Sequence, residues 1–360
     1  MAQRYVAYIL GLFAAFGSAF LLLTDTAEAK KEGEFYGAKI TEYPEWFKES
    51  FLNIPEDIEE AKESNKRLII FFNQAGCPYC NALVERNMAQ KDIREKIQNN
   101  FDIVGINMWG DREVTYVNGK QYTEKKLAEA LKVQFTPTLL FYDENGKIVL
   151  RLNGYRSPTK FGVDLDYVAN KKEDDVSYLQ YVKANLPATG GSKKLHKEDF
   201  FDAKPYDLEV SKNNKKPIAV FFEQKDCPDC DTLHKKVLPD EKLREIIKNF
   251  KVVQLDMWSK TPVVTPSGKK TTAREWAKAL DINFAPSIVV FNTEGKEVIR
   301  TEGSFKVFHT QSIFSYVLSD AYKKQPSFQR YLSDRADHIR ETGKDVDIWR
   351  YADEKPGDRK

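Results

Sequence analysis

The sequence predicts an α/β protein of two tandem domains, each a small mixed β-sheet flanked by helices. Three observations predict this fold. Two Cys-x-x-Cys pairs each follow a short apolar run, a single proline follows each pair 59 or 60 residues later, and the surroundings of the pairs repeat along the chain. The pairs are Cys77-Pro78-Tyr79-Cys80 and Cys227-Pro228-Asp229-Cys230, after the apolar runs 68–72 and 218–222, and the prolines are Pro137 and Pro286.

The internal repeat keeps its register over many points. Asn107-Met108-Trp109 recurs as Asp256-Met257-Trp258, and Phe135-Thr136-Pro137 recurs as Phe284-Ala285-Pro286, both at an offset of 149 residues, whereas the cysteines are offset by 150. A repeat of this length is a whole domain rather than a solenoid unit. We expect a first domain over 30–186, a Pro/Gly/Ser-bearing linker over 187–198, a second domain over 199–335 and a charged C-terminal segment over 336–360, forming an exposed helix or loose tail.

The first copy predicts the order of elements. Acidic residues early and basic residues late predict a helix over 55–65, and the fully apolar run 68–72 is typical of a central strand. Cys80, Val84 and Met88 recur every four residues and predict a helix over 77–98. The remaining expectations are a strand over 102–109, a hairpin with a type I′ turn at Asn118-Gly119, a helix capped by Thr123, strands over 137–142 and 147–152, and a closing helix or helix pair.

The N-terminal 29 residues have the pattern of a targeting segment. Arg4 precedes an uncharged apolar stretch over 5–23, and Ala27-Glu28-Ala29 fits a small-x-small cleavage site. The stretch approaches the roughly 20 residues that span a bilayer, so a signal peptide and a retained signal anchor are both open. Either way the rest of the chain is expected to be exported and periplasmic, soluble after cleavage or held by an N-terminal anchor. The net charge of +2 offers no electrostatic basis for binding nucleic acid.

Each cysteine pair has the requirements of thiol–disulfide exchange, which are a thiolate and a second thiol close by. Cys77 is expected at or just before the start of a helix, with Pro78 at the first helical position, where no backbone donor is lost. The free amides and the dipole of the helix start favour a negative sulfur. In such motifs the thiol pKa falls from about 8.5 to between roughly 3.5 and 7.5. Cys80, one turn later, would be less exposed and would resolve the mixed disulfide.

Other uses of a Cys-x-x-Cys pair are open. The two pairs are too far apart in sequence for a shared four-cysteine zinc site, but His234 follows Cys230 by four residues and could add a third ligand in the second copy. Val84 occupies that position in the first copy. Covalent haem would need histidine where Asn81 and Asp231 stand. Each pair could also be a purely structural disulfide. We expect no metal and no cofactor.

With these motifs together, each half resembles the thioredoxin superfamily, and within it the exported bacterial thioredoxins, including those associated with sulfur oxidation. The resemblance implies that Cys77 and Cys227 attack, and that Cys80 and Cys230 resolve. It also implies that Pro137 and Pro286 are cis-prolines facing the dithiols, so that a substrate chain can lie beside Thr136 or Ala285. From the sequence alone, each proline could instead simply begin a strand.

Three departures from the superfamily pattern stand out. The dipeptides between the cysteines are Pro-Tyr and Pro-Asp instead of Gly-Pro, and Pro-Tyr resembles the less reducing glutaredoxins. Phe71 and Phe221 replace the buried acid six residues before the first cysteine. Gly76 and Asp226 replace the aromatic residue directly before it.

The second dithiol lies in an acidic stretch of sequence. Asp226, Asp229 and Asp231 surround it, and Lys225 offsets only part of their charge, whereas Cys77 has no acidic residue within five positions. Because nearby negative charge disfavours a thiolate, we expect Cys77 to have the lower thiol pKa and the first site to be the more oxidising. The acids could equally be a solvated helix start.

The expected activity is that of a periplasmic thiol–disulfide oxidoreductase. Its partners would be the thiols and disulfides of exported proteins and, for a reductive role, a membrane thiol carrier of electrons. One alternative is a binding or assembly protein that uses the fold without turnover. A weaker alternative is a metal chaperone that uses Cys227, Cys230 and His234.

Overall fold

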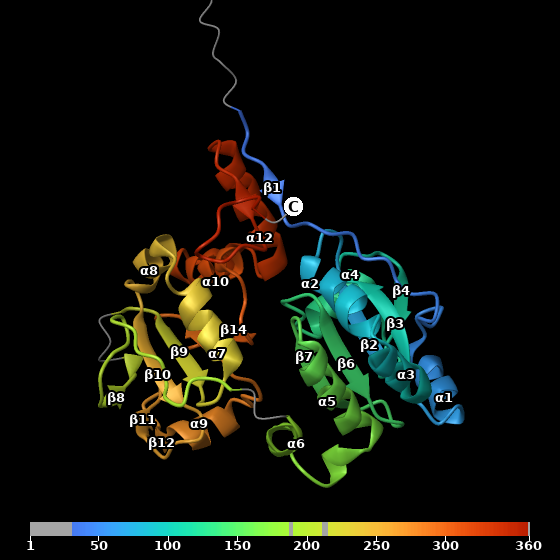
Figure 1. Ribbon diagram of the computed structural model, residues 1–360. Helices are drawn as coiled ribbons and strands as arrows, with labels where there is room; N and C mark the ends of the chain where they lie inside the picture. Colours follow the sequence, from blue (N-terminus) through green and yellow to red (C-terminus); the bar gives the residue numbers. More distant parts are fainter. Residues whose placement is uncertain (1–30, 187–189, 211–214, 359–360) are drawn as a thin grey trace, which may run out of the picture.

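The computed structural model describes residues 31–186, 190–210 and 215–358. It contains two α/β units side by side, as expected, each with a four-stranded mixed sheet flanked by helices (Figure 1). The targeting segment expected over 1–29 lies outside the described residues. Within the described ranges, no helix is long and apolar enough to cross a membrane.

The two four-stranded sheets have the same topology. In each, the first two strands are parallel and the remaining pairs are antiparallel. The first sheet has the order β3 (Phe101–Asn107), β2 (Arg67–Asn73), β6 (Thr138–Tyr142) and β7 (Ile148–Asn153). The second has the order β10 (Lys251–Asp256), β9 (Ile218–Glu223), β13 (Ser287–Phe291) and β14 (Glu297–Glu302).

Strand β2 is central, as its apolar sequence predicts. Successive side chains of a strand point to opposite faces of the sheet. Every apolar residue of the run 68–72 is buried, because helices cover both faces. Ile69 and Phe71 pack into a core that contains residues of α3 (Lys91–Asn100) and α5 (Pro158–Ala169). Leu68, Ile70 and Phe72 pack into the other core, with residues of α1 (Ile54–Glu63) and α4 (Glu124–Ala130).

The helix expected over 77–98 is divided. It consists of α2 (Pro78–Ala82), a π-helical turn (Leu83–Met88) and α3, with the break at Ala89 and Gln90. The apolar stripe explains the break. The buried residues Cys80, Val84 and Met88 are four positions apart, whereas the next one, Ile93, follows Met88 by five positions. A single straight helix would therefore turn Ile93 away from the core. The second domain is divided likewise into α7 (Pro228–Thr232), a π-helical turn (Leu233–Val237) and α8 (Glu241–Ile247).

The expected hairpin is present between β4 (Glu113–Thr115) and β5 (Gln121–Thr123). Its turn is not type I′, because only Gly119, with φ of 74°, has a left-handed backbone and Asn118 does not. The amide of Gly119 instead donates to the carbonyl oxygen of Tyr116 at 2.8 Å. Thr123 caps α4 as expected, accepting a hydrogen bond from the amide of Lys126 at 3.4 Å.

The expectation of an exposed helix or loose tail over 336–360 is wrong for much of that segment. Helix α12 (Phe328–Glu341) extends into it, and β15 (Val346–Asp347) pairs in parallel with β1 (Phe35–Tyr36), so the two ends of the described chain lie together (Figure 1). Ala336, Val346 and Ile348 are buried in the core of the second domain. These few apolar residues lie among many charged ones, and the strand that pairs with β15 lies 311 residues earlier in the chain.

The two domains contact each other through matching positions of the repeat. Phe135 of the first domain packs on Phe328 of α12, with ring centroids 5.4 Å apart. Phe284, the counterpart of Phe135, packs on Tyr178 of α6 (Tyr178–Asn185), the counterpart of Phe328, at 5.5 Å. Such reciprocal contacts are the mark of a two-fold interface. Since Phe135 and Phe284 each lie two residues before a proline that faces a dithiol, both dithiols are next to this interface.

Candidate active sites at the domain interface

The first dithiol lies at the start of α2. Cys77 is the N-cap residue and Pro78 the first helical residue, as expected. Cys77 and Cys80 form a disulfide bond, with their Cα atoms 5.3 Å apart. The backbone amide of Cys80 donates to the sulfur of Cys77 at 3.1 Å. In the reduced state the same amide would support a thiolate on Cys77, because a hydrogen bond to the charged form favours that form.

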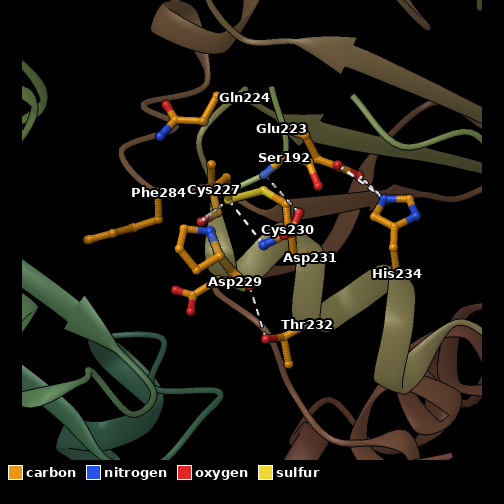
Figure 2. The surroundings of a disulfide bond; sticks show 12 residues. Ser192, Glu223, Gln224, Cys227, Asp229, Cys230, Asp231, Thr232, His234 and Phe284 are labelled. Atoms are coloured by element: carbon orange, nitrogen blue, oxygen red, sulfur yellow. Dashed lines mark hydrogen bonds and ion pairs between the residues drawn. A yellow bond between two sulfur atoms is a disulfide. The ribbon is translucent and has the colours of Figure 1, made fainter. Parts of the chain in front are cut away.

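The second dithiol has the same construction. Cys227 is the N-cap residue of α7, and its disulfide bond with Cys230 joins Cα atoms 5.2 Å apart. The amide of Cys230 donates to the sulfur of Cys227 at 3.1 Å. Figure 2 shows this disulfide together with Asp229 and Asp231, the acidic residues directly before and after Cys230.

Both prolines face their dithiols through cis peptide bonds, as the resemblance implied. The bonds Thr136-Pro137 and Ala285-Pro286 are cis, and a third cis bond, Lys204-Pro205, was not expected. The sulfur of Cys77 lies 3.5 Å from the carbonyl oxygen of Thr136, and the sulfur of Cys227 lies 3.5 Å from that of Ala285.

The attacking sulfurs are open to grooves rather than to bulk solvent. Cys77 and Cys227 are each only 4% exposed, and Cys80 and Cys230 are buried further, which agrees with the expected order of exposure. A groove of about 330 Å³ contains Cys77 and Thr136, and a groove of about 440 Å³ contains Cys227 and Ala285. Each groove is walled partly by the other domain, the first by α10 (Val307–Leu318) and α12, the second by α6.

The residue before each attacking cysteine has a left-handed backbone. Gly76 has φ of 74° and Asp226 has φ of 54°. Glycine adopts this conformation freely, and aspartate tolerates it better than most residues. A bulky aromatic residue, which the superfamily pattern has here, would be strained in this turn.

Two glutamines at the sites were missed by the sequence analysis. Gln74 accepts a hydrogen bond from the indole of Trp109 at 2.8 Å, and Gln224 accepts one from Trp258 at 2.7 Å. Both glutamines lie three residues before an attacking cysteine, and both line a groove. The signal was present in the repeat, because glutamine and tryptophan recur in both copies at the offsets already noted.

The third residue of each motif contacts the other domain. The ring of Tyr79 packs on Trp349 at 4.6 Å and edge-on against His309 at 5.3 Å. Asp229 forms an ion pair with Lys160 of α5. Since Lys160 and His309 are counterparts in the repeat, the two contacts are again reciprocal.

The acids of the second site are all paired with basic residues. Asp226 pairs with Lys193 and Asp229 with Lys160, and Asp231 pairs with His196. Burial alone would raise the pKa of Asp231, but hydrogen bonds from His196 and Ser192 hold it below its usual range. The negative charge that the sequence places beside Cys227 is therefore largely compensated, and the expected difference in thiol pKa between the sites stays a prediction.

A buried polar cluster lies behind the second dithiol. His234 bonds Glu223 at 3.0 Å through Nε2 and Glu198 at 2.8 Å through Nδ1, and Figure 2 shows its ring directed at Glu223. Burial alone would lower the pKa of His234, but the bonds to Glu198 and Glu223 raise it to about 9. Both ring nitrogens of His234 are thus bonded to glutamates, and among the described residues no group of three His, Cys, Asp or Glu could hold a metal ion.

Comparison with known proteins agrees with this geometry. A family model described as a thioredoxin-like domain matches residues 54–169 and again 205–317, which is more than half of the chain. The chain belongs to the thioredoxin-like domain family. The two matches lie within the two domains expected from the repeat. A search of curated proteins found no match.

Several solved structures are similar to one thioredoxin-like domain of this chain. One is a thioredoxin-fold protein from Helicobacter pylori, with 24% identity, a TM-score of 0.30, and coverage of 38% of this chain and 91% of that chain. Another is a thioredoxin from Thermus thermophilus, with 19% identity, a TM-score of 0.28, and coverage of 39% and 89%. A third is a disulphide isomerase from Xylella fastidiosa, with 15% identity, a TM-score of 0.25, and coverage of 41% and 98%.

Proposed function

We propose that this thioredoxin-like protein is an exported thiol–disulfide oxidoreductase that acts on exported protein substrates at both dithiols. The observation that carries the proposal is the placement of each attacking sulfur. Cys77 and Cys227 cap a helix, accept an amide hydrogen bond and open onto a groove beside Thr136 or Ala285. This is the arrangement that thiolate chemistry and a bound substrate chain both require.

The reaction at the first site follows from this geometry. In the reduced protein the Cys77 thiolate attacks one sulfur of a substrate disulfide and forms a mixed disulfide, and the other substrate sulfur leaves as a thiolate that takes up a proton. The Cys80 thiolate then attacks the sulfur of Cys77 and releases the second substrate thiol. Two electrons pass from the dithiol to the substrate, and the reverse sequence oxidises a substrate dithiol. Cys227 and Cys230 act in the same way at the second site.

The proposed substrates and electron source follow from export. A polypeptide would lie along Thr136-Pro137 or Ala285-Pro286, strand-fashion, with its cysteine at the attacking sulfur. If the role is reductive, a membrane thiol carrier supplies the electrons, since an oxidising compartment cannot.

Trapping of the mixed disulfide tests the proposal. Replacing the resolving cysteine, by Cys80→Ser or Cys230→Ser, should leave substrates covalently attached, and the matched variants Cys77→Ser and Cys227→Ser should trap nothing. The purified wild-type protein should also reduce insulin disulfides when dithiothreitol is present. No covalent adduct at either site together with no insulin reduction would refute catalysis.

A second candidate is a binding protein that holds a partner without turnover. One observation favours it, namely that both attacking cysteines are only 4% exposed and line grooves that the other domain partly walls. Reduction potentials separate the two functions. A structural disulfide lies below about −300 mV and a working one well above that value. Potentials should be measured in the full chain, with the other dithiol replaced by serines, because each groove is walled by both domains.

A further inference from the structure

The grooves of the two dithiols differ in charge at positions that match in the repeat. Lys183 of α6 and Lys225, which lies two residues before the attacking cysteine, line the second groove. At an offset of 150 residues their counterparts are Ser333 of α12 and Ala75, and both of these line the first groove. Two cationic side chains of the second groove are therefore replaced by a hydroxyl and a methyl group in the first.

Both lysines are exposed, and one ammonium group can be placed at the groove. The Nζ atom of Lys183 lies 4.6 Å from the centroid of the ring of Trp258, which lines the same groove. Among the described residues, neither Lys183 nor Lys225 forms an ion pair. In the first domain Arg330 lies over the matching Trp109 at 4.6 Å, but neither of these two residues lines the first groove.

Most other charges in the two grooves are compensated by ion pairs. In the second groove these pairs are Arg156 with Asp164, Lys160 with Asp229 and Asp226 with Lys193. The one further carboxylate in its described lining is that of Asp256, so the two lysines leave this groove with a net positive charge. In the first groove Asp337 and Arg340 pair with each other at 3.3 Å, and burial lowers the pKa of His309 to about 4, so that its ring is neutral at physiological pH. The described lining of the first groove therefore carries no net charge.

A difference in charge of this kind selects among substrates. A cysteine-containing segment that lies along Ala285 with its sulfur at Cys227 passes between the dithiol and α6. Carboxylates beside its cysteine would be attracted by the two lysines, whereas basic residues there would be repelled. The first groove instead offers mainly apolar side chains, among them Phe305, Phe308 and Leu332.

We propose that the two dithiols act on different substrates, and that Lys183 and Lys225 direct cysteine-containing segments with acidic flanking residues to Cys227. Segments with uncharged, apolar flanking residues go to Cys77. This inference rests on the proposed function and adds the substrate class of each site. The exchange step is the same at both sites, with bonds and electrons as described above for Cys77 and Cys80, and only the selection of the substrate differs.

Kinetics with one working site at a time test the proposal. One parent is the full chain with Cys77→Ala and Cys80→Ala, and the other is the full chain with Cys227→Ala and Cys230→Ala. With dithiothreitol as reductant, each parent reduces a disulfide-linked peptide pair whose cysteines are flanked by glutamate, and a second pair flanked by glutamine. The readout is the ratio of kcat/KM for the acidic pair to that for the neutral pair. Because acidic flanks also alter the reactivity of the peptide itself, the ratio at the second site is divided by the ratio at the first.

The second site should favour the acidic pair about three- to tenfold more than the first site does, mainly through KM, as expected for two exposed ion pairs. At about 1 M sodium chloride, where the screening length is about 3 Å, this difference between the sites should disappear. Equal ratios at the two sites at low salt, or a difference that salt does not reduce, would overturn the proposal.

Exchange of the matched residues assigns the preference to the lysines. Lys183→Ser with Lys225→Ala gives the second site the residues of the first, and should bring its ratio down to that of the first site. Ser333→Lys with Ala75→Lys is the reciprocal variant, and should create the acidic preference at the first site. All four positions are exposed, so these variants should fold. A preference that persists without the lysines, or that does not appear in the reciprocal variant, would also overturn the proposal.

The two levels of inference fail differently. If neither parent turns over either peptide pair, the proposed function is refuted and this inference with it. If both parents turn over the peptides without a difference in preference, only the assignment of substrates to the two sites is refuted.

Discussion

The side-chain amide of Asn153 donates a hydrogen bond to the carboxylate of Glu302 at 2.8 Å, and the two residues occupy the same position in the two copies of the repeat, 149 residues apart. A residue that contacts its own counterpart lies on the local two-fold axis of an interface. Reciprocal contacts flank the pair. Phe135 packs on Phe305 at 5.0 Å, and their counterparts Phe284 and Arg156 stack at 4.2 Å. The two domains therefore pack like the halves of a symmetric dimer within one chain.

Phe135 should be a main contributor to domain docking. Its ring belongs to the core of the second domain, although its backbone belongs to the first. Phe135→Ala should lower the free energy of unfolding by about 3–5 kcal/mol, the cost of a large cavity. Urea denaturation measures this change, and small-angle scattering should record a larger radius of gyration. Phe51 is fully exposed, so Phe51→Ala is the matched control and should change neither. Equal stability of the two variants would contradict the described interface.

Gly191 should control access to the second disulfide. A Cβ atom at this position would lie 2.3 Å from the backbone nitrogen of Cys227, so Gly191→Ala must move the connector away from the dithiol. The expected result is a severalfold faster reduction of Cys227–Cys230 by glutathione, followed by mass spectrometry of alkylated thiols. Gly162 of α5 is the control, since nothing lies within 4 Å of an added Cβ there. Gly162→Ala should leave the rate unchanged and favour the helix by up to about 1 kcal/mol.

The buried cluster around His234 should make stability depend on pH. The pKa of His234 is raised from its ordinary 6.5 to about 9 in the folded chain, so its charged form is favoured by folding. This contribution is complete below pH 6.5 and is lost as the pH rises through 9. The free energy of unfolding, from urea titrations, should fall by on the order of 2–3 kcal/mol over that range.

A double variant provides the control for this pH dependence. Glu223→Gln with His234→Gln keeps hydrogen-bonding groups in place and avoids an unpaired buried charge. It should flatten the profile between pH 6.5 and 9. A profile as steep as that of the wild type would assign the dependence to other groups.

Lys160 should set the reactivity of the second dithiol. Its removal in Lys160→Met leaves the carboxylate of Asp229 uncompensated between Cys227 and Cys230. The alkylation of Cys227 by iodoacetamide in the reduced protein should shift to higher pH and slow by about two- to fivefold at neutral pH. The double variant Lys160→Met with Asp229→Asn should recover the wild-type rate. A slow double variant would mean that Lys160 acts through packing and not through charge.

Lys160 also shows why the charge around the second dithiol could not be predicted from the sequence. Asp226, Asp229 and Asp231 were visible beside Cys227, but their partners Lys193, Lys160 and His196 are 33 to 69 residues away in sequence. Charge near a site can be counted from the sequence only when it is local. The same limit hid His309, since no motif connects it with Cys77.

Local patterns, by contrast, predicted the start of each dithiol helix. Proline after cysteine and the apolar stripe behind it predicted the N-cap position of Cys77, and the recurrence of both motifs predicted the second site. The missed helix break at Ala89 and Gln90 came from extending a spacing of four across a shift of one residue. The C-terminal segment was expected to be exposed because its many charged residues hide the apolar signal of Val346 and Ile348. These two residues are buried in a region where β15 pairs with β1, at the other end of the described chain.

By itself the sequence determined two copies of a strand, a capped dithiol helix and a facing proline, because these depend on periodicity, capping and turn preferences that act over a few residues. The tertiary structure decided which groups surround each sulfur. The two-fold packing brings His309 to the first groove and Lys160 to the second, and it covers both cysteines with the opposite domain. Such contacts depend on the docking of two apolar surfaces whose residues lie far apart along the chain, so no local pattern encodes them.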